Sequence, residues 1–103
     1  MRIIKRLSEM IEEEAEGAEC YAKKALMIKD ERPSLGKMFY NLANDELGHV
    51  DTLHNAVVAL IKEYREDEGD PPEGMMAVYD YLHEKQIDKV AEVKSMLAKY
   101  QNN

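Results

Sequence analysis

Apolar side chains recur along this chain at alternating steps of three and four residues, the spacing that places them on one face of a helix. The pattern runs through three segments, roughly residues 3–29, 35–67 and 73–100. The first is rich in Glu, Ala, Lys and Met, which favour helices, and only Gly17 disfavours one. Since no segment alternates in the manner of a β-strand, the sequence predicts an all-α protein with three long helices.

Proline and glycine are few, and they separate the three segments. Pro33 and Ser34 interrupt the pattern once, and Ser34 is the expected N-cap of the second helix. Gly69 ends the second segment. The run Asp70-Pro71-Pro72-Glu73 then offers an N-cap, a proline at the first helical position and an acid in the first turn. We therefore expect a single domain over residues 1–103, a long antiparallel helical hairpin followed by a third helix.

On each predicted helix the apolar positions form a stripe that is expected to face the core. The stripe of the first helix contains Ile4, Leu7, Ile11, Glu14, Ala18, Tyr21, Ala25 and Ile28. That of the second contains Leu35, Phe39, Leu42, Glu46, His49, Leu53, Ala56 and Leu60. That of the third contains Met76, Tyr79, Leu82 or His83, Ile87, Val90, Val93, Leu97 and Tyr100. Helices of this length span about 45 Å, and a short chain leaves part of such stripes uncovered, so we expect self-association.

Three ionisable residues interrupt the stripes where apolar side chains belong: Glu14, Glu46 and His49. Removing a carboxylate from water costs several kcal/mol, by order of magnitude, unless it is paired or bound to a metal. Glu46 and His49 form an E-x-x-H pair, and residues three apart share one face of a helix, so both can bind the same ion. Glu14 on the neighbouring helix could complete the site.

Each of these residues also has a simpler interpretation. All three histidines follow an acid by three residues, and such pairs also stabilise ordinary exposed helices. His54 falls off the stripe and is predicted to be solvated, and His83 is borderline. Glu14 belongs to an acidic run, so a neighbouring glutamate, or a stripe shifted to Ala15 and Ala22, remains an alternative. Without a metal, the same residues would form a buried polar network that fixes helix register in a non-enzymatic interaction module.

Composition limits the classes of partner. Among the 103 residues, 14 lysines and arginines oppose 21 aspartates and glutamates, a formal net charge of −7. This charge repels phosphate backbones and anionic membranes, so neither nucleic acid nor membrane is an expected partner. One cysteine, Cys20, can form no intrachain disulfide, and we expect an inert, half-buried thiol. With no signal-like or membrane-spanning apolar run, a cytoplasmic location is expected.

The segment from Ile11 to Leu60 resembles the ferritin-like superfamily, in particular short members such as encapsulated ferritin and the helical half of rubrerythrin. The resemblance rests on Glu14 followed seven residues later by Tyr21, and on Glu46-Leu47-Gly48-His49 in the next helix. A carboxylate-bridged di-iron site uses four glutamates and two histidines, of which one chain offers half. Two antiparallel chains would supply the whole set and complete a four-helix bundle.

The resemblance also implies roles for these residues. Glu46 would bridge two irons, Glu14 and His49 would be terminal ligands, and the Tyr21 hydroxyl would support a carboxylate. It implies a homodimer, or a higher even-numbered oligomer, that holds two irons per dimer, with manganese or zinc as alternatives, and that oxidises Fe(II) with oxygen or peroxide. The chain has no four-cysteine rubredoxin module, and residues 96–103 lack the Gly-Leu-Ile-rich tail of packaged ferritins. Both departures argue against a complete rubrerythrin and against residence in a protein shell.

Overall fold

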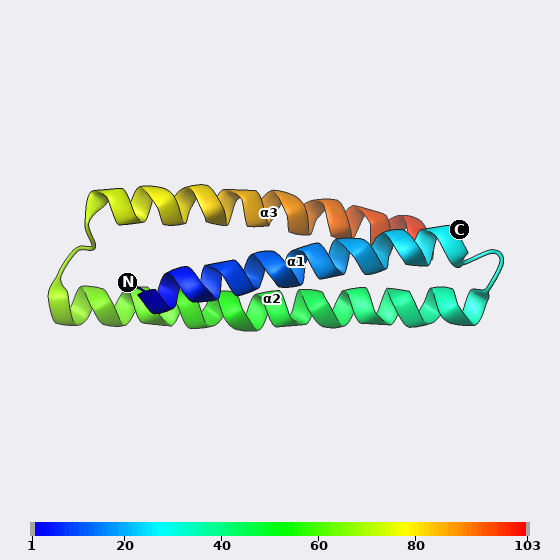
Figure 1. The fold of residues 1–103 in the computed structure, drawn as a ribbon, viewed down its shortest axis with the longest axis horizontal. Helices are drawn as coiled ribbons and strands as arrows, with labels where there is room; N and C mark the ends of the chain where they lie inside the picture. The colour runs from blue at the N-terminus through cyan, green and yellow to red at the C-terminus, as the bar shows by residue number, and fades with distance from the viewer. Residues whose placement is uncertain (1, 103) are drawn as a thin grey trace.

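The computed structural model describes residues 2–102, which form three α-helices and no strand. They are α1 (Arg2–Ile28), α2 (Pro33–Glu68) and α3 (Glu73–Gln101). Figure 1 shows α1 and α2 as an antiparallel hairpin and α3 running back along it, within an elongated body of 55 × 19 × 18 Å. The all-helical prediction, the hairpin and the third helix are confirmed. None of the described helices is long and apolar enough to cross a membrane.

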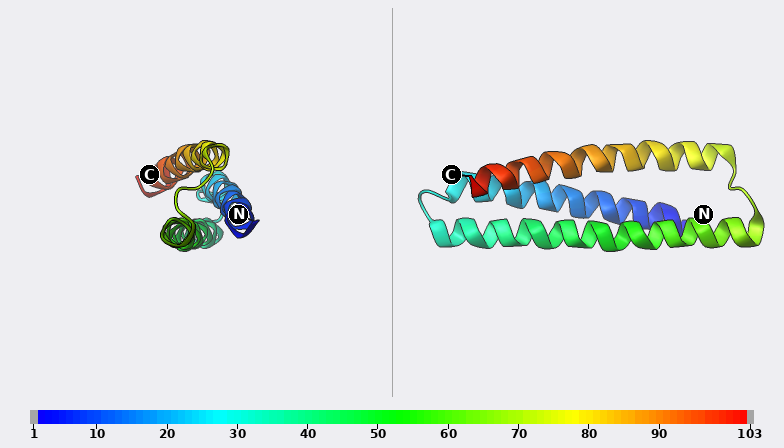
Figure 2. Two further views of the ribbon diagram at one scale, coloured as in Figure 1. Left: turned by 90° about the vertical axis from the view of Figure 1, so that its left-hand side faces the viewer. Right: turned by 180° about the vertical axis from the view of Figure 1, so that it is seen from behind.

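Helix α1 lies at the centre of the packing, because its backbone runs close to both α2 and α3, whereas the backbones of α2 and α3 approach each other at few points. It runs obliquely: its first turns lie beside α2, and its last turns approach the C-terminal end of α3 (Figure 2). Its buried side chains are mostly small, which lets two helices approach it closely; they are Ile4, Ser8, Ile11, Ala15, Ala18, Ala22 and Ala25. The predicted stripe and the shifted stripe through Ala15 and Ala22 therefore both contribute buried residues to the core.

The core consists of two clusters along this central helix. One joins the start of α1 to the later part of α2, and its most enclosed members are Ile11 and Val57. The other joins Ala18 and Ala22 to Ala43 of α2 and Val93 of α3. The single chain thus buries its apolar surface mainly along α1.

The predicted stripe of α2 is wrong by one position. The buried positions are Gly36, Ala43, Val50, Val57 and Ile61, whereas Leu35, His49 and Ala56 are exposed. Two apolar stripes run side by side on α2. Helix α1 covers the stripe of buried positions, and the predicted stripe lies at the edge of the contact between α1 and α2. On α3 only Val93 and Leu97 are buried, and the side chain of Ile87 is 54% exposed, because α1 diverges from the N-terminal half of α3 (Figure 1).

Both predicted N-caps are also wrong. Helix α2 begins at Pro33, with Arg32 at the cap position, so Ser34 lies inside the first turn. Helix α3 begins only at Glu73, and Pro72 precedes it with extended backbone (φ −53°, ψ 139°). A residue that precedes a proline is driven away from helical geometry, so in a Pro-Pro pair the first proline cannot begin the helix. Asp70 is consequently too far upstream to act as the cap.

Polar contacts fix the C-terminal half of α3 to the hairpin. The Lys29 ammonium donates to the Tyr100 carbonyl oxygen at 2.6 Å, and the Tyr100 ring stacks on Tyr40 with centroids 4.8 Å apart. Further along, Lys89 Nζ lies 3.0 Å from Glu19 Oε2. The hydrogen bond from Lys89 lowers the pKa of Glu19, so the pair stabilises the fold above the usual pKa of glutamate and loses this effect as the pH falls.

Replacing Gly36 by alanine is predicted to destabilise the hairpin, although alanine normally favours a helix over glycine by about 1 kcal/mol. A Cβ at Gly36 would lie 2.9 Å from Lys29 Cα, a backbone atom that cannot rotate away. We expect a net loss of about 1–3 kcal/mol in the free energy of unfolding, typical of overpacking. Urea denaturation followed by circular dichroism measures it.

The matched control is Gly48→Ala, because a Cβ at Gly48 has no neighbour within 4 Å. This variant is expected to be at least as stable as the original protein. Equal stability of the two alanine variants would show that the close approach of the helices at Gly36 does not constrain the fold.

Candidate metal centre

The antiparallel hairpin brings Glu14, Glu46 and His49 together from the middle of two helices. Glu14 is on α1, and the other two lie one turn apart on α2, so their side chains leave the same face. One ligand atom from each of the three lies within 4.8 Å of the others. The sequence-predicted ligand set therefore forms one cluster, and among the described residues it is the only group of three or more acidic, histidine or cysteine side chains with this spacing.

His49 links the two carboxylates. Its Nδ1 atom is 3.3 Å from Glu14 Oε2 and 3.9 Å from Glu46 Oε2. The side chains of Glu14 and Glu46 are 30% and 23% exposed, and that of His49 is 59% exposed. The prediction that these residues lie within a buried stripe is thus only partly right, because they lie along the edge of the hairpin and open to solvent.

The donor set suits a hard or borderline divalent cation. Two carboxylates and one imidazole offer oxygen and nitrogen ligands of the kind that iron, manganese and zinc accept. Octahedral ions hold neighbouring donors about 3 Å apart and opposite donors about 4.2 Å apart, so contacts of 3.3 and 3.9 Å are near ligating separations without matching them. Three side chains leave coordination positions open, so one chain does not enclose an ion.

The structure distinguishes Glu14 from the other glutamates of its acidic run. Glu12, Glu13 and Glu16 are exposed, and Glu19 pairs with Lys89 on the side of α3. Glu14 alone among these five turns toward His49. It is therefore the residue of α1 that the fold brings to the cluster.

Tyr21 does not support a carboxylate within the single chain. Its ring stacks on Phe39 with centroids 6.2 Å apart, and it packs against the second core cluster. Over residues 2–102, the structure records no hydrogen bond from its hydroxyl group. The interpretation of Tyr21 as a core residue is therefore the one that the structure favours.

The other histidines lie between α2 and α3, away from the cluster. The ring of His83 stacks on His54 at 4.8 Å and on Tyr79 at 5.6 Å between centroids. His83 is consequently not brought to the candidate site. His54 is half-buried, which corrects the prediction of a solvated side chain, because α3 covers this side of α2.

Cys20 is exposed, which corrects the prediction of a half-buried thiol. The face of α1 that contains it contacts neither α2 nor α3.

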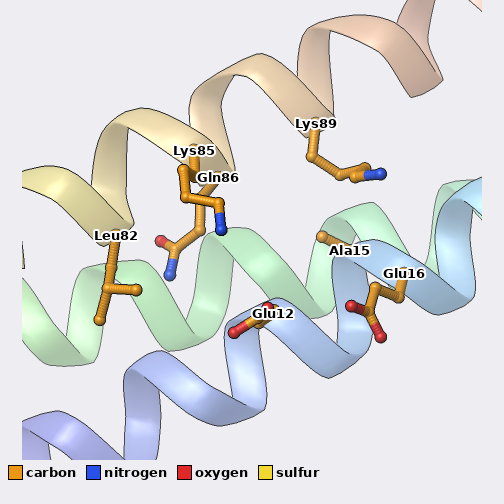
Figure 3. A pocket seen from close by; sticks show the side chains of 7 residues that line it. All are labelled: Glu12, Ala15, Glu16, Leu82, Lys85, Gln86 and Lys89. Carbon is orange, nitrogen blue, oxygen red and sulfur yellow. The ribbon is translucent and has the colours of Figure 1, made fainter.

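A separate cleft between α1 and α3 is lined by opposite charges (Figure 3). Glu12 and Glu16 project from α1, Lys85 and Lys89 project from α3, and Ala15 forms part of the floor. These charges lie across from one another and offset each other. The cleft contains none of the three candidate ligands, so the candidate metal site is distinct from this cleft.

Comparison with known proteins does not place the chain in a family. No family model, curated protein or solved structure matches it.

Removing the charge of Glu46 is predicted to leave the metal-free protein as stable as before, or more stable by about 0.5 kcal/mol. Glu46→Gln keeps the shape of the side chain and removes one of two neighbouring negative charges, and like charges at such positions destabilise a helix pair by this order. Thermal unfolding in the presence of a chelator at pH 8 measures the effect.

Glu13→Gln, on the exposed surface next to Glu14, is the control for a general loss of negative charge. If the cluster were a polar network that holds the helices together, Glu46→Gln would lower the free energy of unfolding by about 1–3 kcal/mol. A loss of that size, absent from the control, would identify a structural role for the network.

Proposed function

We propose that this protein is a ferritin-like, rubrerythrin-like carboxylate protein that holds two iron ions between two copies of the chain and oxidises Fe(II) with oxygen or peroxide. The observation that supports it is the convergence of Glu14, Glu46 and His49 from two antiparallel helices on one open edge of the hairpin. Manganese or zinc are alternative occupants of the same donors.

The site is incomplete in one chain, which supports a second copy as the partner. Three protein donors are too few for an octahedral ion, and two such sets supply the four glutamates and two histidines of a di-metal site. Apolar residues lie uncovered on the same edge of α2: Leu35 is 43% exposed, and Ala56 is also exposed. A second copy packed antiparallel along this edge would cover them and complete a four-helix bundle.

The proposed chemistry assigns a task to each ligand. Glu46 is the proposed bridge between the two ions, and Glu14 and His49 are the proposed terminal ligands. His49 would bind an ion through Nδ1, the ring nitrogen that contacts Glu14, only as a neutral imidazole that carries its proton on Nε2. Bound iron would supply electrons to oxygen or peroxide. The net charge of −7 helps to concentrate cations near the site.

A second candidate function is a helical interaction module without redox chemistry, with a polar network or a purely structural metal. The 3.3 Å contact between His49 and Glu14 favours it, because the two side chains partner each other without any ion. An exposed, unpaired Cys20 fits a reducing compartment such as the cytoplasm under either function.

The proposal predicts about one Fe(II) per chain in an anaerobic titration, and an even-numbered oligomer by solution mass, because two chains share two ions. Replacing Glu46 or His49 by alanine is expected to weaken iron binding at least tenfold, which corresponds to 1.4 kcal/mol or more, while helix content is unchanged. Iron is quantified by elemental analysis after desalting, and helix content by circular dichroism.

Glu13→Ala and His54→Ala are the matched controls, because each removes the same type of side chain outside the cluster, and both are expected to bind iron normally. Oxygen or peroxide consumption after adding Fe(II) then separates an oxidase from a structural metal site. Equal iron content in His49→Ala and in the original protein would refute the assigned ligands.

A further inference from the structure

Gly17 is the only glycine of α1, and it lies in the middle of the helix between Glu14 and Tyr21. Glycine weakens a helix interior, so its presence there calls for a reason. Gly69 has a positive φ of 84°, and Gly36 has no room for a Cβ, but neither condition holds at Gly17. Unlike Gly48, which also has room for a Cβ, Gly17 lies beside a candidate ligand. The fold alone does not explain this residue.

The space that Gly17 leaves empty adjoins a candidate metal ligand. A Cβ at this position would lie 3.5 Å from Glu46 Oε2 and 3.7 Å from Glu46 Cδ. These are ordinary van der Waals distances, so alanine would fit the metal-free structure without a clash. A larger side chain would press directly against the carboxylate. The residue at position 17 therefore controls how freely the Glu46 carboxylate can turn.

Metal binding requires the Glu46 carboxylate to move. Glu46 Oε2 is 3.9 Å from His49 Nδ1, whereas neighbouring donors on one octahedral ion lie about 3 Å apart and opposite donors about 4.2 Å apart, so the carboxylate lies at neither separation. The side of the carboxylate that faces α1 is bounded by Gly17, whose missing side chain leaves that side open.

We infer that Gly17 is a positioning residue of the metal centre: its missing side chain gives the Glu46 carboxylate room to turn from its metal-free position into a ligating one. This inference rests on the proposed function and adds a residue that is not a ligand. It explains why α1 retains a poor helix former next to the candidate site. It also implies that stability and metal affinity change in opposite directions when position 17 is filled.

The experiment compares Gly17→Ala and Gly17→Val with the original protein. In the metal-free state, Gly17→Ala is expected to raise the melting temperature by about 4 °C, because alanine favours the helix. Its Fe(II) affinity is expected to fall about threefold, and that of Gly17→Val at least tenfold, because the larger side chain restricts Glu46 further. Anaerobic titration with Fe(II) measures the affinities, and the visible absorption spectrum with Co(II) reports altered ligand geometry.

Gly48→Ala is the matched control, since Gly48 is also inside a helix and a Cβ there meets nothing within 4 Å. It is expected to raise the melting temperature without changing the affinity or the Co(II) spectrum. If the original protein binds iron and Gly17→Val binds it equally well with the same Co(II) spectrum, the inference about Gly17 is wrong and the proposed function stands. If the original protein binds no iron, the proposed function itself fails, and the inference fails with it.

Discussion

The close packing of α1 against two other helices is the interaction on which the rest of this structure depends. Alanine at positions 15, 18, 22 and 25 leaves little side-chain volume between the helices, so α2 and α3 can both approach one central helix. The backbones of α2 and α3 approach each other at few points and are joined mainly by ring stacking, so α1 is the main support of both helices. The same packing leaves one edge of the hairpin, with Glu14 on it, uncovered by α3.

The uncovered edge of the hairpin explains why ionisable side chains occupy positions at which the sequence pattern predicts apolar side chains. Glu14, Glu46 and His49 lie at the margin of the helix contact, where water still reaches them. A fully enclosed pair of carboxylates would carry a large desolvation penalty, whereas a partly exposed pair retains much of its hydration. A single chain can therefore accommodate the cluster. The repulsion between its carboxylates, and their attraction for a cation, would become strong only if another surface covered the cluster and excluded water.

The sequence predicted the helices and the Glu46–His49 pair well because both depend on local spacing, whereas Glu14 was selected by its place on the stripe of the first helix and by the family resemblance. The three segments were bounded by Pro33 and Gly69, and the E-x-x-H spacing placed Glu46 and His49 on one face of a helix. The face of α2 that meets α1 could not be predicted, since two neighbouring stripes fit the same periodicity and tertiary contacts decide between them. The stacking of His54 on His83 was likewise missed, because it joins residues from different helices.

Because His49 is open to solvent, the metal affinity of the proposed site would depend on protein concentration. In the proposed dimer the site is divided between two chains, so ion binding and association would stabilise each other by mass action. At low concentration each chain would carry an unfinished site that binds ions weakly. As the protein accumulates, its apparent affinity for metal would rise without any change in the residues that bind it, and the chain would act as a concentration-gated metal binder.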